Sequence, residues 1–320
     1  MGFAFVHPFT KESLIADAQG DLCCSHDQGE ILLRQVDGCY DFVVLHESTA
    51  DRGYYDEHYH HGCGTAGGDI SVASIGTVWE QNSSYHLLYE TVGDVRGKSM
   101  LLLGNGISGK EVRFAAEGAN VVYTDISLEA VLTMKRAYEG STLRTQNSGD
   151  IQFHAVDALH LPFQDGTFDV IYGCAFAHHL QDLPTFFREV HRCLKTGGKC
   201  VFLDDAHSQA WQFAKATILR PLQMFSHWRS GISPEDKVAT QKGGYSKDEL
   251  EEMLVRHGFK SLIYRRTMFF EHLIRRGSTK VLSRGIGQAF APIGRCVDRR
   301  LLGPRWIERH GMHLVWGFTK

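Results

Sequence analysis

The sequence feature that most constrains the fold is a glycine-rich turn between an apolar run and an amphipathic segment. Residues 100–103 are all apolar, as expected of a parallel strand that is buried on both faces. They lead into Gly104-Asn105-Gly106-Ile107-Ser108-Gly109-Lys110-Glu111, and residues 108–117 carry apolar side chains at helical spacing. Glycines let the backbone turn tightly and approach a ligand, and the start of a helix offers free N–H groups. The pattern predicts a strand, a ligand-binding turn and a helix.

Further strand and helix signals alternate along the chain, which predicts a mostly parallel sheet with helices on its faces. Strands are expected at 121–124, 151–156, 168–172 and 199–203, with a final antiparallel pair at 261–264 and 313–318. Helices are expected at 84–92, 127–138, 183–194 (with a stop at Gly197-Gly198) and 246–257, where Ser246 and Glu249 form a capping box. The expected fold class is α/β: a Rossmann-like sheet of seven strands, the last one antiparallel, with an N-terminal extension and helical insertions.

Four segments follow from these signals. We expect an N-terminal extension or lid at 1–98, a core at 99–205, a substrate lid at 206–245, and a C-terminal part of the core at 246–320 with a basic helical insertion at 265–311. Residues 1–98 hold 15 acids and 5 bases, whereas residues 256–320 hold 14 bases and 3 acids. Either these two parts pack against each other, or the basic part faces an acidic ligand or a membrane surface.

Cysteine usage and hydropathy narrow the class of protein. The eight cysteines form no CxxC pair, which is typical of free thiols in a reducing compartment. No secretory signal opens the sequence, and no stretch reaches the roughly 18 apolar residues of a membrane span. His58, His60 and His61 lack the spacing of a metal site, so no metal is expected. We expect a cytoplasmic protein, with peripheral membrane contact left open.

The glycine turn alone fits three kinds of ligand. It matches the dinucleotide fingerprint with Asp125 about 20 residues on, and it nearly matches a P-loop, except that Glu111 replaces the Mg²⁺-binding hydroxyl. S-adenosylmethionine (SAM) needs the turn and an acid after each of the next two strands, where Asp125 and Asp157 stand. A carboxylate accepts two hydrogen bonds from vicinal hydroxyls. The competing interpretation makes Asp125 a helix cap and Asp157 a turn residue.

Three runs of residues favour SAM. Asp157-Ala158-Leu159-His160-Leu161-Pro162-Phe163-Gln164-Asp165-Gly166-Thr167-Phe168-Asp169-Val170-Ile171, then Ala177-His178-His179-Leu180-Gln181-Asp182, then residues 188–199 (REVHRCLKTGGK) follow in order. They resemble the motifs D-x-x-x-L-P-F-x-D-x-x-F-D-x-V, L-H-H-x-x-D and R-E-x-x-R-x-L-K-P-G-G of class I SAM-dependent methyltransferases of the ubiquinone/menaquinone-biosynthesis type (methyltransferase domain type 11). The resemblance implies a class I methyltransferase sheet, SAM as cofactor and S-adenosyl-L-homocysteine as product.

The resemblance also implies roles at matching positions. The residues expected at the cofactor are Gly104, Asn105 and Gly106 (methionine and ribose), Asp125 (ribose), Ile126 (adenine face), Asp157 and Ala158 (adenine edge), Gly173 and Cys174 (methionine ammonium) and Tyr55 in a lid. The chain departs from the family at Leu102, where an acid is usual, at Asn105 in place of cysteine, and at Gly109, a displaced third glycine. A SAM-fold protein without methyl transfer activity, serving as a binding module or non-redox catalyst, is therefore the alternative. An NAD oxidoreductase is a third possibility.

Candidate bases lie where the fourth and fifth strands end, at the edge where open α/β sheets bind ligands. They are His179 and His178, then Asp205 and His207 with Asp204 beside them. A base suits O- or C-methylation of a small-molecule or lipid-like acceptor, whereas an amine or thiol needs none. The histidines could instead hold the loop in place. The basic insertion could meet a phosphate-bearing acceptor or an anionic membrane, no nucleic acid is expected, and the oligomeric state is not predicted.

Overall fold

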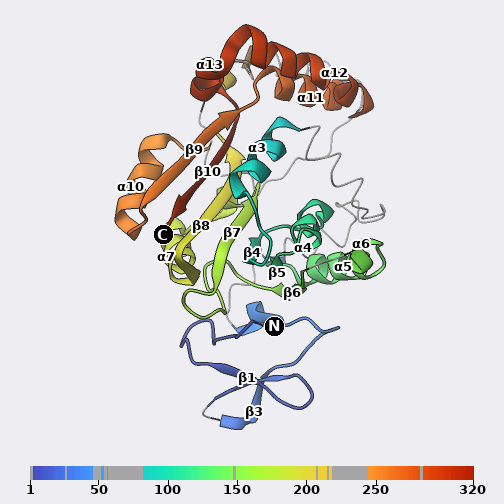
Figure 1. Ribbon diagram of the computed structural model, residues 1–320, viewed down its shortest axis with the longest axis vertical. Coiled ribbons are helices and arrows are strands. Elements are labelled where there is room, and N and C mark those ends of the chain that lie inside the picture. Colours follow the sequence, from blue (N-terminus) through green and yellow to red (C-terminus); the bar gives the residue numbers. More distant parts are fainter. Residues whose placement is uncertain are drawn as a thin grey trace.

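A seven-stranded sheet in the order β6-β5-β4-β7-β8-β10-β9 forms the centre of the computed structural model (Figure 1). The structure describes residues 3–25, 27–45, 52–53, 56, 82–146, 149–206, 208–214, 216–217, 244–281 and 284–320. The strands of the sheet are β4 (Ser99–Leu103), β5 (Asn120–Asp125), β6 (Ile151–Ala155), β7 (Phe168–Cys174), β8 (Leu194–Asp205), β9 (Ser261–Thr267) and β10 (His313–Thr319). Strands β6, β5, β4, β7 and β8 are parallel, and β10 is antiparallel to both of its neighbours. The predicted fold class is confirmed.

Helices cover both faces of this sheet. The helices α3 (Ser83–Val92), α4 (Arg113–Ala116) and α5 (Leu128–Glu139) bury side chains such as Leu88, Phe114 and Met134 against one face. The helices α7 (Leu183–Cys193) and α10 (Lys247–His257) bury Phe187 and Leu250 on the other. Burial of such side chains contributes roughly 1.5–3 kcal/mol each, so the two apolar layers fix the sheet between them.

Three local expectations meet different outcomes. Ser246 and Glu249 form the predicted capping box. The helix expected at 108–117 is wrong as a continuous element, because the 3₁₀ helix η2 (Gly109–Val112) precedes the short α4. The expectation that Gly197-Gly198 stops α7 is also wrong: α7 ends at Cys193 and β8 begins at the next residue. The glycines lie inside β8, where Gly197 adopts φ +80° and donates to the carbonyl of Lys320.

A second, three-stranded sheet lies beyond the β6 edge (Figure 1). Its strands β1 (Leu14–Ala16), β2 (Leu22–Cys24) and β3 (Asp27–Leu33) precede the 3₁₀ helix η1 (Phe42–Leu45). Phe5 and Tyr40 of this region pack into the apolar core of the main sheet, and the N–H of Ala155 donates to the carbonyl of Tyr40 at 2.9 Å. The segment at Tyr40 and Asp41, which follows the N-terminal sheet, therefore pairs with part of the edge strand β6.

The Arg-Glu-x-x-Arg run of the sequence fastens α7 to the loop after β6. Glu189 accepts hydrogen bonds from Arg192, from the N–H of Leu161 and from Lys11 of the N-terminal segment, at 2.8–3.0 Å. Arg192 also donates to the carbonyls of Leu161 and Phe163. Burial disfavours the carboxylate, but these cations lower the pKa of Glu189 below its ordinary value. This motif therefore orders the loop that follows Asp157.

The chain between β9 and β10 forms a helical lobe at one end of the molecule (Figure 1). It consists of α11 (Phe270–Val281), α12 (Arg284–Val297), the π-helix η5 (Asp298–Leu302) and α13 (Gly303–His310). The remaining short helices are α6 (Leu143–Gln146), η3 (Ala177–His179) and α8 (Gln209–Ala214). No helix within the described ranges combines the length and apolar character that crossing a bilayer requires.

Candidate active site at the carboxyl edge of the sheet

The glycine turn after β4 is held by the carboxylate at the end of β5. Gly104 and Gly106 adopt φ +59° and +54°, a region that favours glycine. The N–H of Gly106 donates to Oδ2 of Asp125 at 2.8 Å, and the N–H of Ser127 donates to Oδ1 at 3.0 Å. Burial raises the pKa of Asp125, while these donors oppose that rise. Asp125 thus braces the turn and holds Ser127, which is the N-cap of α5; the interpretation that made Asp125 the helix cap is wrong.

Asp157 reaches the same edge from the neighbouring strand. The N–H of Val156 donates to the carbonyl of Asp125 at 2.8 Å, which fixes the end of β6 beside the end of β5. The Asp157 carboxylate accepts the N–H of Leu159 at 2.9 Å and lies 3.2 Å from Nδ1 of His160. It forms the turn that one interpretation of the sequence predicts. The structure therefore brings together the glycine turn and two strand-end carboxylates.

A buried amide marks the turn as a place that a polar ligand fits. Asn105 is 7% exposed, and both polar atoms of its side chain lack a hydrogen-bond partner among the described residues. Leaving such a group unpaired costs about 1–3 kcal/mol, which a polar ligand at the turn would recover. Ile126 is half-buried and Ala158 is buried beside the two acids, as suits contact with a purine. The residues present fit an adenosyl ligand.

Phe176 is a residue that sequence analysis did not foresee at this site. A Cβ added at Gly104 would lie 2.0 Å from Cδ2 of Phe176, and one added at Gly173 would lie 3.1 Å from Cδ1. The ring therefore rests directly on the glycine turn, between the ends of β4 and β7. Leu102, where the resembled family carries an acid, is fully buried. The glycine turn thus has an aromatic neighbour, and no carboxylate stands at position 102.

Beside the turn, Lys110 and Glu111 form a buried ion pair. Nζ of Lys110 lies 2.8 Å from Oε1 of Glu111 and 4.9 Å from the ring centre of Tyr85 on α3. Burial opposes the charge, but Glu111 raises the pKa of Lys110 above its ordinary value. Glu111 also accepts the hydroxyl of Tyr172 at 3.2 Å. Lys110 matches the lysine of a P-loop, but it forms an ion pair with Glu111, the residue that replaces the Mg²⁺-binding hydroxyl of that motif.

The thiol of Cys174 lies at the end of β7, in the same neighbourhood. Burial raises its pKa to about 11, so the thiol stays protonated near neutral pH and is a poor nucleophile. The family resemblance implies that the backbone carbonyls of Gly173 and Cys174, not the thiol, contact the methionine ammonium of SAM. Strand β7 places both residues next to the glycine turn, because Gly173 pairs with Leu103 in the register of β4 and β7.

The N-terminal segment reaches the carboxyl edge through a chain of charged groups. Arg52 binds the buried carboxylate of Asp41 at 2.7 Å and that of Asp56 at 3.2 Å. Asp56 in turn accepts the hydroxyl of Ser127, the residue after Ile126. The i,i+4 spacing of Arg52 and Asp56 was the only signal of this link in the sequence. The predicted lid residue Tyr55 and the candidate base His207 lie outside the described residues.

A histidine–aspartate pair is the most chemically distinctive group at this edge. Nδ1 of His178 lies 2.7 Å from Oδ1 of Asp204, which joins the loop after β7 to the end of β8. Nε1 of Trp316 donates to Oδ2 of Asp204 at 3.1 Å. Burial raises the pKa of Asp204, and its donors oppose that rise. A carboxylate at Nδ1 fixes the tautomer and leaves Nε2 as the ring nitrogen for proton exchange.

The other candidate bases occupy different positions. The ring of His179 lies 4.1 Å from that of His178, centre to centre. The side chain of Asp205 lies on the opposite face of β8 from that of Asp204. It is 56% exposed and lies 3.8 Å from Nε2 of His313. Strand alternation thus buries Asp204 behind His178 and exposes Asp205. Among the described candidates, His178 with Asp204 has the geometry of a general base.

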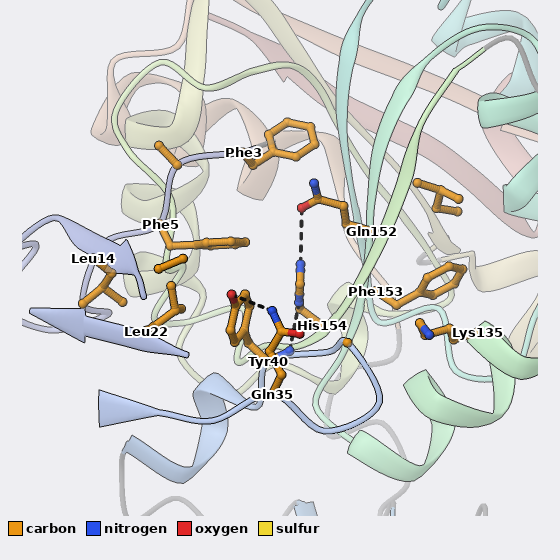
Figure 2. Close-up of a pocket in the computed structure, with 14 residues that line it drawn as sticks. Phe3, Phe5, Leu14, Leu22, Gln35, Tyr40, Lys135, Gln152, Phe153 and His154 are labelled. Atoms are coloured by element: carbon orange, nitrogen blue, oxygen red, sulfur yellow. Dashed lines mark hydrogen bonds between the residues drawn. The ribbon is translucent and has the colours of Figure 1, made fainter. Parts of the chain in front are cut away.

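A separate cavity of about 420 Å³ lies away from the glycine turn, between the N-terminal sheet and β6 (Figure 2). Phe5 and Tyr40 line one side of it, and Gln152 and His154 of β6 line the other. Nδ1 of His154 accepts the N–H of Tyr40 at 3.1 Å, and Nε2 lies 3.4 Å from Oε1 of Gln152. Burial lowers the pKa of His154 to about 3, so this imidazole is neutral. Its polar groups already pair with one another, which indicates a structural network.

Comparison with known proteins agrees with the carboxyl-edge site. Residues 101–202, which run from β4 into β8, match the family described as "Methyltransferase domain". This span contains the glycine turn, both strand-end acids and His178. Together with the strand order of the sheet, the match shows that residues 101–202 are similar to a methyltransferase domain.

Curated relatives of this domain differ in their acceptors. Norajmaline N-methyltransferase of Rauvolfia serpentina is 27% identical over 171 residues, which are 51% of this chain and 57% of that protein. Phosphoethanolamine N-methyltransferase 3 of Arabidopsis thaliana is 26% identical over 56% of this chain and 32% of its own. The ubiquinone/menaquinone biosynthesis C-methyltransferase of Haemophilus ducreyi is 28% identical over 61% and 75%. The chain spans about half or less of the length of the first relatives it matches.

Solved structures give weaker alignments. Phosphoethanolamine N-methyltransferase 2 of Haemonchus contortus with SAM aligns with a TM-score of 0.46 and 16% identity, over 75% of this chain and 52% of that chain. The YcgJ protein of Bacillus subtilis aligns with a TM-score of 0.45 and 18% identity, over 74% and 98%.

Proposed function

We propose that this chain is an enzyme that transfers the methyl group of SAM to a small-molecule or lipid-like acceptor and releases S-adenosyl-L-homocysteine. The observation that carries the proposal is the His178–Asp204 pair, 2.7 Å apart, at the same sheet edge as the glycine turn. Residues 101–202, which match a methyltransferase domain, contain the glycine turn and His178, and Asp204 lies just after them. Because the relatives include N- and C-methyltransferases and a probable tocopherol O-methyltransferase of Oryza sativa, similarity alone leaves the acceptor open.

The cofactor would be held by the residues that fit it. Gly104, Asn105 and Gly106 would contact its methionine and ribose, Asp125 the ribose hydroxyls, and Asp157 the adenine edge. When bound, SAM supplies an electrophilic methyl group on a sulfonium. The protein has to align the acceptor with that methyl group and exclude competing geometries.

His178 would take the proton that the acceptor loses. SAM would supply the methyl group and leave as S-adenosyl-L-homocysteine, whose sulfur keeps the electron pair of the broken S–CH₃ bond. The acceptor would lose the proton of its O–H or C–H bond to Nε2 of His178. Asp204 would stabilise the imidazolium that forms, and Trp316 would hold Asp204 in place. An amine acceptor that is already deprotonated needs no such pair. The pair therefore favours O- or C-methylation.

The experiment is a matched histidine comparison. The full chain is incubated with SAM and a panel of phenols, carboxylic acids, quinols and lipids, and S-adenosyl-L-homocysteine is measured. On the acceptor that is used, His178→Gln should lower kcat about 100-fold or more, because a positioned base contributes at least that much. His179→Gln should change kcat far less, and calorimetry should show unchanged SAM affinity in both. Equal effects of the two variants would remove His178 from its assigned role.

A second function is favoured by one observation, the contact of Phe176 with Gly104. If the ring keeps the methionine end of the site closed, the chain would be a SAM-fold protein that binds a nucleoside or acts without methyl transfer. Calorimetry separates the two. Micromolar SAM affinity with product on some acceptor supports the methyltransferase, whereas binding of adenosine as tight as that of SAM, with no product across the panel, supports the second function.

A further inference from the structure

The helical lobe between β9 and β10, residues 270–310, leaves the sheet next to the candidate active site. In the registers of β9, β10 and β8, Thr267 pairs with His313 and His313 pairs with Asp205. Asp205 directly follows Asp204, so the lobe begins and ends at the carboxyl edge of β8. Figure 1 shows α11, α12 and α13 standing together at this end of the molecule, away from the N-terminal sheet.

Two of the three acidic side chains in residues 265–311, those of Glu271 and Asp298, are buried inside the lobe. Glu271 is fully buried and lies 3.1 Å from Arg275 and 3.2 Å from Arg295. Asp298, 6% exposed, accepts the N–H groups of residues 269–271 at the start of α11. The helices approach closely at Gly294, where a Cβ would lie 2.7 Å from Cα of Glu271. Packing and buried charge therefore fix one face of α12 against α11.

The opposite face of α12 and η5 is apolar, cationic and exposed. Phe290 and Ile293, one helical turn apart, are 53% and 55% exposed, and Leu301 is 77% exposed. Arg299 and Arg300 beside them are exposed as well. Large apolar side chains on a surface usually mark a place of contact when they cluster. Here they are interleaved with arginines, whereas the inward residues of α12 pack on α11.

We propose that this face of α12 and η5 docks on an anionic phospholipid surface. Residues 265–311 hold eleven Lys and Arg and three acids, and two of those acids, Glu271 and Asp298, are buried. Helices of this kind lie in the interface, with apolar side chains among the acyl chains and cations at the headgroups. Nucleic acid would pair with the arginines but leave Phe290 and Ile293 unused. A second copy of the lobe would bring like charge against like charge.

Docking would turn the carboxyl edge of the sheet toward the lipid, since the lobe starts and ends at that edge. Resting on the proposed function, this geometry makes a membrane-partitioned molecule the acceptor class that the site would meet first. The docking itself needs no methyl transfer, so it is tested by binding alone.

The experiment is co-sedimentation of the full chain with vesicles. One set is pure phosphatidylcholine and the other contains about one-third phosphatidylglycerol, a composition that gives an anionic surface. The wild type should bind the anionic vesicles at least tenfold more tightly than the neutral ones. The triple variant Phe290→Ser, Ile293→Ser, Leu301→Ser and the double variant Arg299→Glu, Arg300→Glu should each lose at least tenfold in affinity. High salt should weaken binding of the wild type.

Two matched controls lie on α10, remote from the lobe. Val255, also 77% exposed, is changed to Ser, and Arg256 is changed to Glu. Both should bind vesicles as the wild type does, and circular dichroism should show that every variant is folded. Equal affinity for the two kinds of vesicle, or unchanged binding in the lobe variants, would overturn the proposal. So would a dimer in sedimentation velocity that the triple variant abolishes, because that result would assign the face to a second copy.

Discussion

The N–H of Gly106 points at Oδ2 of Asp125 from 2.8 Å, so the glycine turn and the end of β5 form one rigid unit. The second oxygen of the same carboxylate holds Ser127 at the start of α5. The shape of the turn therefore depends on a side chain that lies on the neighbouring strand. A ligand that binds Asp125 would therefore also contact the glycine turn.

Asp125→Asn should weaken SAM binding about tenfold or more. The amide keeps one acceptor oxygen but directs an NH₂ group at one of the two backbone donors, and an unpaired buried donor costs about 1–3 kcal/mol. Isothermal calorimetry measures the affinity. Asp94→Asn, at an exposed carboxylate outside the site, is the control and should bind SAM normally. Undiminished affinity in Asp125→Asn would contradict a ribose contact.

Asp204→Asn should lower kcat on the identified acceptor about 10- to 100-fold with SAM affinity unchanged, because partners of this kind orient a histidine and stabilise its charge. Trp316→Phe removes only the hydrogen bond behind Asp204 and should lower kcat a few-fold. Steady-state kinetics and calorimetry give the two readouts. A purely structural role would lower thermal stability in both variants and leave kcat per folded molecule intact.

Phe176→Ala should raise SAM affinity several-fold. The ring rests on Gly104, so a ligand that approaches the turn has to displace it, and removing the ring removes that cost. The variant should also lose about 1–3 kcal/mol of unfolding free energy, because Phe176 packs on Phe186. Phe9→Ala, at a 43% exposed ring, serves as the control. Weaker SAM binding in Phe176→Ala would mean that the ring supports the cofactor.

Acid should destabilise the fold through His154. Its pKa is about 3 in the folded protein and about 6.5 in an unfolded chain, so the unfolded state binds more protons between these values. Stability from the neutral imidazole is complete above pH 6.5 and is lost as the pH falls, by about 1.4 kcal/mol per unit. Urea unfolding at pH 7 and pH 5 measures the slope.

The matched variants for this slope are His154→Phe and His86→Gln. His154→Phe is less stable at pH 7, because the N–H of Tyr40 loses its acceptor, but it should lose about 2 kcal/mol less than the wild type between pH 7 and pH 5. His86 is exposed on α3, and its variant should keep the wild-type slope. Identical slopes in all three proteins would show that His154 is protonated in the fold.

Much of the main sheet could be predicted because strands such as β4, β5 and β8 contain apolar runs that lead to a glycine or an aspartate. The pairing of 261–264 with 313–318 was also predicted, although α11, α12, η5 and α13 lie between these strands. The N-terminal sheet escaped prediction, since β1 and β2 have three residues each and too little alternation to stand out. Its strands are stabilised by burial of side chains such as Leu14 and Leu22 in the shared core, a tertiary effect.

The sequence predicts where the site lies in the fold more completely than it predicts which side chains act in catalysis. In the sequence, Gly104, Asp125 and Asp157 each follow a predicted parallel strand, which predicts that they share one edge of the sheet. The choice between His178 and His179, or between Asp204 and Asp205, depends on which side of β8 is buried. Two pairs of neighbouring polar residues do not reveal that side. Phe176 gave no signal, because an aromatic residue in a loop fits many environments.

The position of β10 between β8 and β9 has a consequence for biosynthesis. Residues 313–319 are made after both strands that they join, so the growing chain carries two unsatisfied strand borders until this segment emerges. During that interval Trp316, which is fully buried in the finished sheet, cannot yet close the apolar layer beneath it. Nascent chains stalled before residue 313 would therefore expose apolar surface and unpaired strand edges, and they would depend on chaperones to avoid aggregation.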